Sequence, residues 1–164
     1  MAYFGEEKGL LGSRYYARRP LVPLIKTVAN LNLEQLGRTD GDHPAGTATL
    51  TGFEYSDITK ALEMAGAATG VKIYNPEKNS DAYFARSDNQ SLADRGIPAH
   101  TLLTSFDFPD YHNVADEWEK IDYANLEKVN RTFALTIMMV ADSQEPPRWN
   151  ESNPKTEKYI RARP

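Results

Sequence analysis

Short apolar strands that alternate with longer amphipathic helices are the feature that most restricts the fold of this sequence. In residues 24–34 the side chains alternate in character, with Leu31 and Leu33 on one face. In residues 56–70 and 122–142 apolar side chains recur at three- and four-residue spacing, which is typical of helices with one buried face. Because such elements bury their apolar sides against one another, we expect an α/β fold built in layers, without internal repeats.

The clearest helix begins near Asp122 and runs for about twenty residues, or ~30 Å at ~1.5 Å per residue. The side chains that we expect it to bury are Leu126, Val129, Phe133, Ile137 and Val140. A second helix, capped by Ser56 and closed by Gly70, is expected to bury Ile58, Leu62 and Ala65. Each helix therefore has one face for the core.

Shorter segments complete the expected order of elements. Strands are predicted at residues 1–4, 24–34, 47–51, 71–75 and 97–105, and further helices at 9–17 and 87–96. We expect residues 1–142 to form one domain. The proline-rich, mildly basic residues 143–164 are expected to be an extension that packs on its surface or is disordered.

Composition excludes several classes of protein. The 164 residues are 40 % apolar, which is enough for the core of one domain. The 23 acidic and 19 basic residues give a net charge of −4 without a basic stripe, so nucleic acid is not an expected partner. No apolar run reaches the ~20 residues of a membrane span, and no signal peptide is recognisable. Because cysteine is absent, any metal would be held by His, Asp or Glu.

Side chains that can do chemistry gather where predicted strands end, which is where open α/β sheets usually bind ligands. Glu6 and Glu7 follow the first strand, Glu34 follows the strand at 24–33, and His112 lies in the loop after the last strand. In an irregular turn adjacent glutamates can lie on one side. Glu7 could then bind a metal ion while Glu6 holds the attacking water.

Each of these residues also has a simpler interpretation. A Glu-Glu pair is commonly a solvated turn, a glutamate at a strand end can cap or form a salt bridge, and a lone loop histidine is commonly a surface residue. We interpret His43, in a turn, and His100, within a strand, as structural. The helical zinc motif His-Glu-x-x-His is absent from the sequence.

Four segments, taken in order along the chain, resemble a known family. They are YFGEEKGLLGSRYY, VANLNLEQLGR, ARSDNQSLADRGIPA and DYHNVADEWEKIDYANL. They are similar to the Glu-Glu-Gly-Leu-Leu-Gly-Ser, Asn-Leu-Asp-Met-Ile-Gly, Arg-Ser-Asp and Tyr-His-Thr-x-x-Asp segments of the co-catalytic di-zinc aminopeptidases, metallopeptidase family twenty-eight. This family shares its fold with glutaminyl cyclases and the transferrin-receptor ectodomain. For residues 1–142 the resemblance implies a three-layer zinc-exopeptidase sandwich, in which helices flank a mixed β-sheet.

The resemblance also implies roles for individual residues. Glu6 would be the general base, and Glu7 and His112 would be ligands of one zinc ion. Glu34 would be a ligand of a second zinc ion, and Tyr111 would stabilise the oxyanion of the tetrahedral intermediate. The implied reaction removes the N-terminal residue from a peptide substrate.

Two further residues would support this site by the same resemblance. Arg86 would line the substrate pocket, and Asp116 would orient the loop of His112 from outside the metal's own ligand set. The family usually has Asp at the position of Glu34, and the extra methylene changes the reach of that carboxylate.

The family's first histidine and its bridging aspartate lie well upstream of the Glu-Glu pair, whereas Met1 here stands just before it. We therefore expect a domain that is incomplete at its N-terminus and binds one zinc ion or none, where the intact family binds two. Its activity would be impaired, and exposed sheet edges would favour self-association. The resemblance implies that the intact parent is secreted or periplasmic.

Two other functions stay open at this point. An acyltransferase similar to glutaminyl cyclase would need only one zinc ion and would act on N-terminal glutamine. A non-enzymatic interaction module, as in the receptor branch of the fold, would need no metal ligands. The ligand positions that are present favour an enzyme, whereas the missing histidine and aspartate favour the module.

Overall fold

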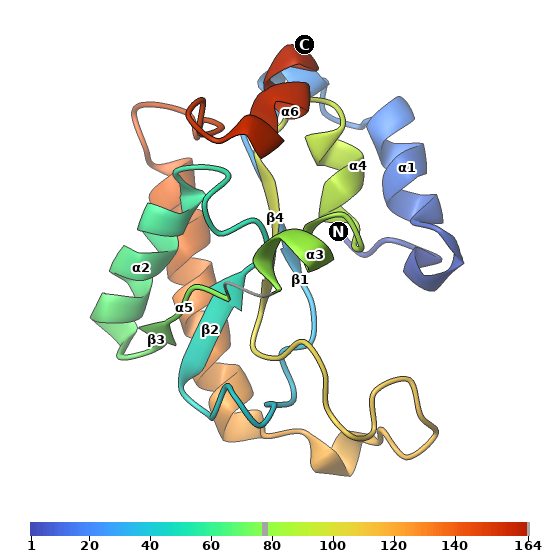
Figure 1. The fold of residues 1–164 in the computed structure, drawn as a ribbon, viewed down its shortest axis with the longest axis vertical. Helices are drawn as coiled ribbons and strands as arrows, with labels where there is room; N and C mark the ends of the chain where they lie inside the picture. The colour runs from blue at the N-terminus through green and yellow to red at the C-terminus, as the bar shows by residue number, and fades with distance from the viewer. Residues whose placement is uncertain (77–78, 164) are drawn as a thin grey trace.

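The central element of the fold is a mixed β-sheet of four strands in the order β1-β4-β2-β3 (Figure 1). The computed structural model describes residues 1–76 and 79–163. The strands are β1 (Asn30–Leu33), β2 (Thr47–Leu50), β3 (Lys72–Ile73) and β4 (Ala99–Leu103). β4 runs parallel to β1 and antiparallel to β2, and β2 runs parallel to β3. The predicted mixed α/β fold is therefore confirmed.

Helices cover both faces of this sheet, which gives three layers (Figure 1). On one face α2 (Ile58–Thr69) and α5 (Tyr123–Ala141) pack against each other, and on the other α1 (Leu11–Arg18) packs against α4 (Asn89–Ala93). Every residue of β4 is buried, as expected for a central strand covered on both faces. The remaining elements are short: η1 (Glu6–Lys8), η2 (Leu24–Lys26), α3 (Ser80–Phe84), η3 (Trp118–Lys120), η4 (Pro154–Thr156) and α6 (Glu157–Arg161).

Two apolar clusters hold these layers together. The first joins α2, α5 and the sheet, and its buried members include Leu50, Leu62, Leu102, Val129 and Phe133. The second lies on the α4 side and is rich in aromatic rings, with buried members that include Tyr55, Phe84, Leu92, Trp149 and Tyr159. We call the second group the aromatic cluster. Its rings pack at centroid distances of 4.7–6.3 Å, the usual range for interacting aromatic side chains.

Three of the four predicted features at the ends of the two long helices are found. The Asp122 carboxylate accepts the N–H of Asn125 at 3.0 Å and so caps α5, which ends at Ala141. Gly70 ends α2 with a φ of +73°. The predicted cap of α2 is wrong by one residue: Asp57 is at the N-cap, and Ser56 precedes it, with its hydroxyl accepting the N–H of Ile58 at 3.2 Å.

The predicted core face of α5 is only partly correct. Val129 and Phe133 are buried, Leu126 and Val140 are partly buried, and Ile137 is 42 % exposed. The helix also buries Thr132 and Thr136. The Thr132 hydroxyl bonds to the hydroxyl of Thr69 in α2 at 2.7 Å. Threonines are tolerated here because the hydroxyls of Thr132 and Thr136 also donate to backbone carbonyls one turn earlier in the helix.

Two predicted strands also differ from the structure. Residues 1–4 form no strand: no strand pairs with them in the described part of the chain, and the Phe4 carbonyl instead accepts the Gly12 N–H at 2.7 Å. The strand predicted at 24–34 is limited to β1, because only residues 30–33 lie in register with β4.

The proline-rich segment after residue 142 packs on the aromatic cluster (Figure 1). Trp149 and Tyr159 are 6 % and 2 % exposed, and the Trp149 indole N–H donates to the Gly96 carbonyl at 2.9 Å. A Trp149 bridge to Ser56 adds a backbone contact. These contacts join residues 143–164 to the core rather than separate them from it. The domain boundary at residue 142 stays a prediction.

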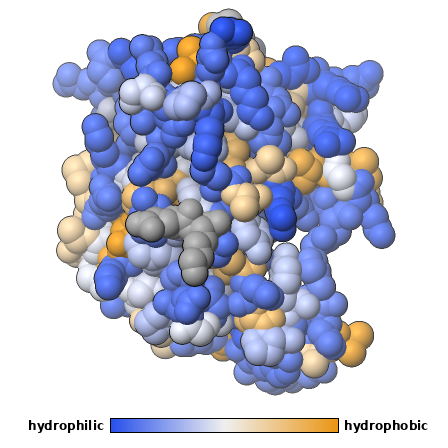
Figure 2. Space-filling model, viewed as in Figure 1, coloured by the Kyte–Doolittle hydropathy of each residue, from blue (hydrophilic) through white to orange (hydrophobic). Residues whose placement is uncertain are grey.

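The outer surface in Figure 2 is mostly hydrophilic, and it is hollowed between the body and the lobe formed by the loop after β4. Within the described residues, no helix has both the length and the apolar character needed to cross a bilayer.

Candidate functional site

A pocket of about 420 Å³ opens where β1 and β4 end, the edge at which α/β sheets usually bind ligands. Six of the residues singled out from the sequence line it: Glu6, Glu7, Glu34, Arg86, Tyr111 and His112. They come from four separate segments of the chain. Asp116 is not among the lining residues.

The turn that carries Glu6 and Glu7 is a single 3-10 turn between two glycines in the left-handed region. The Glu6 carbonyl accepts the N–H groups of Gly9 and Leu10 at 3.0 and 2.9 Å, which tightens this turn. Both carboxylates therefore line the same pocket, as the interpretation of an irregular turn predicted.

Glu7 and His112 are two potential metal ligands of the pocket that lie in contact. Glu7 Oε1 and His112 Nε2 lie 3.4 Å apart, and both side chains are about half exposed. Two ligand atoms at ~2.0–2.1 Å from a tetrahedral zinc ion lie about 3.4 Å from each other. The pair therefore fits two corners of a zinc site. However, no three His, Asp or Glu side chains within residues 1–76 and 79–163 lie close enough to hold a metal ion by themselves.

The backbone of His112 is strained. Its φ of +56° is unusual for a residue with a side chain and costs on the order of 1–3 kcal/mol. The His112 ring lies against the Tyr111 ring at a centroid distance of 4.0 Å. Such a conformation persists only where the surrounding structure holds it.

Negative charge is concentrated in this pocket. Burial, followed by the nearby Glu34 and Glu7 carboxylates, raises the pKa of Glu6 to about 7. Burial also raises the pKa of Glu34, although a hydrogen bond from Ser87 opposes this shift. Carboxylates gathered in this way favour the binding of a proton or a cation.

Tyr111 and Arg86 are two of the hydrogen-bond donors that line the pocket. Burial and the neighbouring carboxylates, Glu34 first, raise the pKa of Tyr111, so its hydroxyl keeps its proton at neutral pH. The Arg86 guanidinium stacks on the Tyr83 ring at 4.7 Å and makes no ion pair with any residue that the structure describes.

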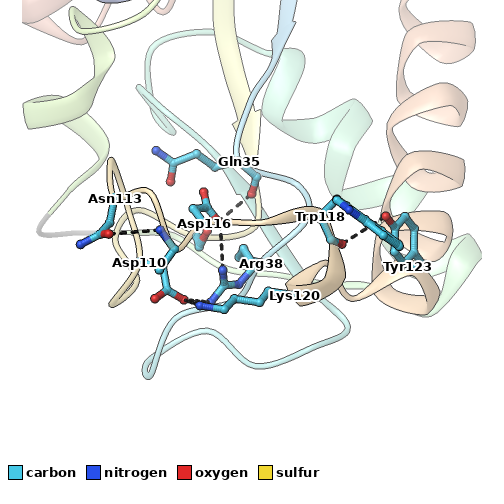
Figure 3. Close-up of polar contacts among 10 residues, drawn as sticks. Gln35, Arg38, Asp110, Asn113, Asp116, Trp118, Lys120 and Tyr123 are labelled. Carbon is cyan, nitrogen blue, oxygen red and sulfur yellow. Dashed lines mark hydrogen bonds and ion pairs between the residues drawn. The ribbon is translucent and has the colours of Figure 1, made fainter.

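The loop of Tyr111 and His112 is held by ion pairs that the sequence did not predict (Figure 3). Asp110 and Asp116 each pair with Arg38 at 2.9 Å, and Lys120 pairs with Asp110 at 3.0 Å. We call these four residues the Arg38 cluster. Hydrogen bonds from Arg38 and then Lys120 hold the pKa of Asp110 below its usual range. Asp116 thus contacts Arg38. Nothing in the sequence pattern indicates a functional role for Arg38 except its place four positions after Glu34.

Neither of the other two histidines lines the pocket. His100 is fully buried: its Nδ1–H donates to the Thr51 carbonyl at 2.7 Å, and its Nε2 accepts from the Ser56 hydroxyl at 2.6 Å. Burial lowers the pKa of His100 to about 4. His43 lies 2.6 Å from the Asp40 carboxylate and stacks on Tyr74.

Comparison with known proteins decides the family. The family model described as "Peptidase family M28" matches residues 1–137. This chain belongs to peptidase family M28. None of the curated protein sequences compared with this M28 chain is significantly similar to it.

Solved structures share the fold of this M28 chain. The LapA aminopeptidase of Legionella pneumophila matches with a TM-score of 0.71 and 19 % identity, over 87 % of this chain and 38 % of that one. BSAP, a zinc aminopeptidase from Bacillus subtilis, matches with a TM-score of 0.66 and 19 % identity, over 83 % and 34 %. The glutaminyl cyclase of Porphyromonas gingivalis matches with a TM-score of 0.53 and 20 % identity, over 84 % and 49 %. The M28 chain thus spans about a third of the length of these aminopeptidases and half that of the cyclase.

Proposed function

We propose that this chain carries part of the active site of a zinc-dependent aminopeptidase, which removes N-terminal residues from peptides. The observation that supports this most directly is the Glu7–His112 pair, whose 3.4 Å separation suits two ligands of one zinc ion. Glu6 is next to this pair, and Tyr111 lines the same pocket.

Glu6 is the general base of the proposed reaction. It takes the proton of the attacking water and passes it to the leaving amine. A carboxylate with a pKa of about 7 can accept and release a proton near neutral pH, which is what this role requires. The Tyr111 hydroxyl donates a hydrogen bond to the oxygen that becomes negatively charged, and Arg86 contacts the substrate.

Zinc, when bound, would polarise the scissile carbonyl and lower the pKa of the attacking water. Glu7 and His112 are the proposed ligands of the first ion, and Glu34 of the second. Since the described residues hold no complete ligand set, the proposed site takes further donors from water, substrate or other polypeptide. For this reason we propose that the chain by itself binds one zinc ion weakly and no second ion, and that its activity is impaired.

Two glutamate variants test this assignment, because a base and a ligand fail differently. With an aminoacyl anilide as substrate, Glu6→Gln should keep the zinc affinity of the wild type and lose ~10²–10⁴ in turnover. Glu7→Gln should bind zinc more weakly and recover partly when zinc is raised. Glu127→Gln, on the exposed face of α5, is the matched control and should change neither property. Measurable activity that is equal in all four proteins, together with equal zinc affinity, would rule out the proposed roles.

Similarity in fold to a glutaminyl cyclase supports a second candidate, and the single Glu7–His112 pair agrees with a reaction that needs one zinc ion. In that case the substrate is a peptide with N-terminal glutamine, and the product is its cyclised form. Mass spectrometry of such a peptide separates the two candidates: the cyclase product has lost ammonia, whereas the aminopeptidase product has lost the glutamine residue.

We also propose that the β1 edge pairs with another copy of this chain. Asn30 and Glu34 donate their backbone N–H groups to the β4 side, so Leu31 and Leu33 present theirs to the open side. Exposed apolar residues that precede this edge include Leu21, Ile25 and Val28. Leu31→Pro should abolish any dimer seen by light scattering, whereas a wild-type chain that is monomeric at all concentrations would refute this proposal.

A further inference from the structure

Arg38 joins the two loops that carry the proposed metal ligands (Figure 3). One loop follows β1 and begins with Glu34, and the other follows β4 and contains His112. The Arg38 guanidinium contacts the second loop twice, through Asp110 and through Asp116. These two acids flank Tyr111 and His112 in the sequence, so a single side chain fixes both ends of the segment that carries them.

The backbone of Arg38 is itself held firmly against the end of β4. The Thr104 hydroxyl lies 2.8 Å from the Arg38 carbonyl and 2.7 Å from the Gln35 carbonyl, directly after β4 ends. The guanidinium carbon lies 4.7 Å above the Phe108 ring, and the side chain is only 19 % exposed. Arginine offers two separate N–H edges in one rigid plane, which is why it can hold two carboxylates at once.

The conformation of His112 requires such a support. Its φ of +56° is unfavourable by itself, and the polar and aromatic contacts of the ring within the described residues are those with Glu7 and Tyr111. The Asn113 N–H donates to the Asp110 carbonyl at 2.9 Å and closes a turn around Tyr111 and His112. The two ion pairs anchor the ends of this turn to Arg38, so without them the turn would be free to move relative to Glu7. The Glu7–His112 separation would then no longer suit one metal ion.

We propose that Arg38 is a positioning residue: by holding Asp110 and Asp116 it fixes His112 relative to Glu7 and Glu34. This inference rests on the proposed function. Arg38 would support metal binding without contacting the metal ion itself. Asp116 acts on His112 only through Arg38.

The test is a zinc titration followed by calorimetry, together with backbone amide exchange. Arg38→Gln should lower zinc affinity ~10–100-fold, the usual effect of removing a group that orients a ligand, while the melting temperature changes little. Exchange should become faster in residues 108–117 and stay unchanged in α5. Arg38→Lys, which can reach only one acid at a time, should fall between wild type and Arg38→Gln. Arg131→Gln, which removes an exposed arginine paired with Glu127, should behave as wild type.

Zinc affinity within twofold of wild type in Arg38→Gln, with unchanged exchange in 108–117, would overturn the proposal. If Arg38→Gln fails to fold, Asp110→Asn and Asp116→Asn each remove one ion pair at a more exposed position and should each weaken zinc binding. Undiminished binding in both would also overturn it. If the wild-type chain takes up no zinc, the proposed function fails, and exchange alone then decides whether Arg38 orders the loop.

Discussion

Two histidines at opposite ends of β4 have opposite surroundings. His100, near the start of the strand, is fully buried beside the aromatic cluster, and both of its ring nitrogens are hydrogen-bonded. His112, in the loop after the strand, is half exposed, has a strained backbone and lies among carboxylates. The region around His100 has the burial and hydrogen bonding that are typical of a stable core. The region around His112 combines backbone strain with neighbouring carboxylates, which are unfavourable features typical of functional sites.

This difference predicts that substitutions in the two regions will have effects of different size. Trp149→Ala, in the aromatic cluster, should lower the free energy of unfolding by about 3–5 kcal/mol, because it leaves a cavity and an unpaired Gly96 carbonyl. Trp118→Ala is the matched control: Trp118 is 68 % exposed, so its loss should cost little. Chemical denaturation measures both. Equal losses in the two variants would contradict the contrast, and would mean that residues 143–164 add little to the core.

The loss of stability in acid should come in large part from His100. Its pKa is about 4 in the folded protein, because burial disfavours the charged ring, against a value near 6.5 when unfolded. The unfolded chain therefore binds a proton first, and stability is lost as pH falls from about 6.5 to about 4. The 2.5-unit difference corresponds to about 3 kcal/mol at most.

Urea titrations at pH 7 and pH 4.5 check this. His100→Gln should have a flatter pH dependence, although it is less stable at pH 7 because the ring's hydrogen bonds to Thr51 and Ser56 are changed. An unchanged slope in His100→Gln would show that the acid-sensitive group is not His100.

The same contrast shows which parts of the molecule can be predicted from its sequence. The α/β layers, β4 and the ends of α2 and α5 follow from apolar periodicity and local caps such as Asp122, which depend on residues close together in the chain. The meeting of Glu34 and His112 in one pocket also followed, because β1 and β4 end at the same edge of the sheet. Glu6 lines this pocket although the strand predicted before it is absent.

What failed depends on contacts between distant residues. Residues 1–4 have strand-like composition, but no neighbouring strand pairs with them in the described structure. Ile137 fits the apolar stripe of α5, yet hydroxyl contacts between Thr132 and Thr69 decide which face meets α2. Similarly, Arg38 lies 72 positions from Asp110 and 78 from Asp116, so no local pattern reveals the ion pairs.

The smallest effect should be a gain in stability within the pocket. Glu6→Gln removes one of several neighbouring negative charges, and its raised pKa means that the folded chain resists ionisation of this group. Above pH 7 the ionised carboxylate therefore destabilises the fold. Because Glu6 is partly exposed and water screens the repulsion, the gain should be only a few tenths of a kcal/mol, up to about 1. At pH 5, where the carboxyl is protonated in the folded state, the gain should disappear.

Urea denaturation in metal-free buffer at pH 8 and pH 5 measures this gain in stability. Glu127→Gln is the control, which loses a few tenths of a kcal/mol with its exposed ion pair to Arg131. If Glu6→Gln is instead destabilising at pH 8, the pocket contributes to the fold as the aromatic cluster does, and the contrast between the two ends of β4 does not hold.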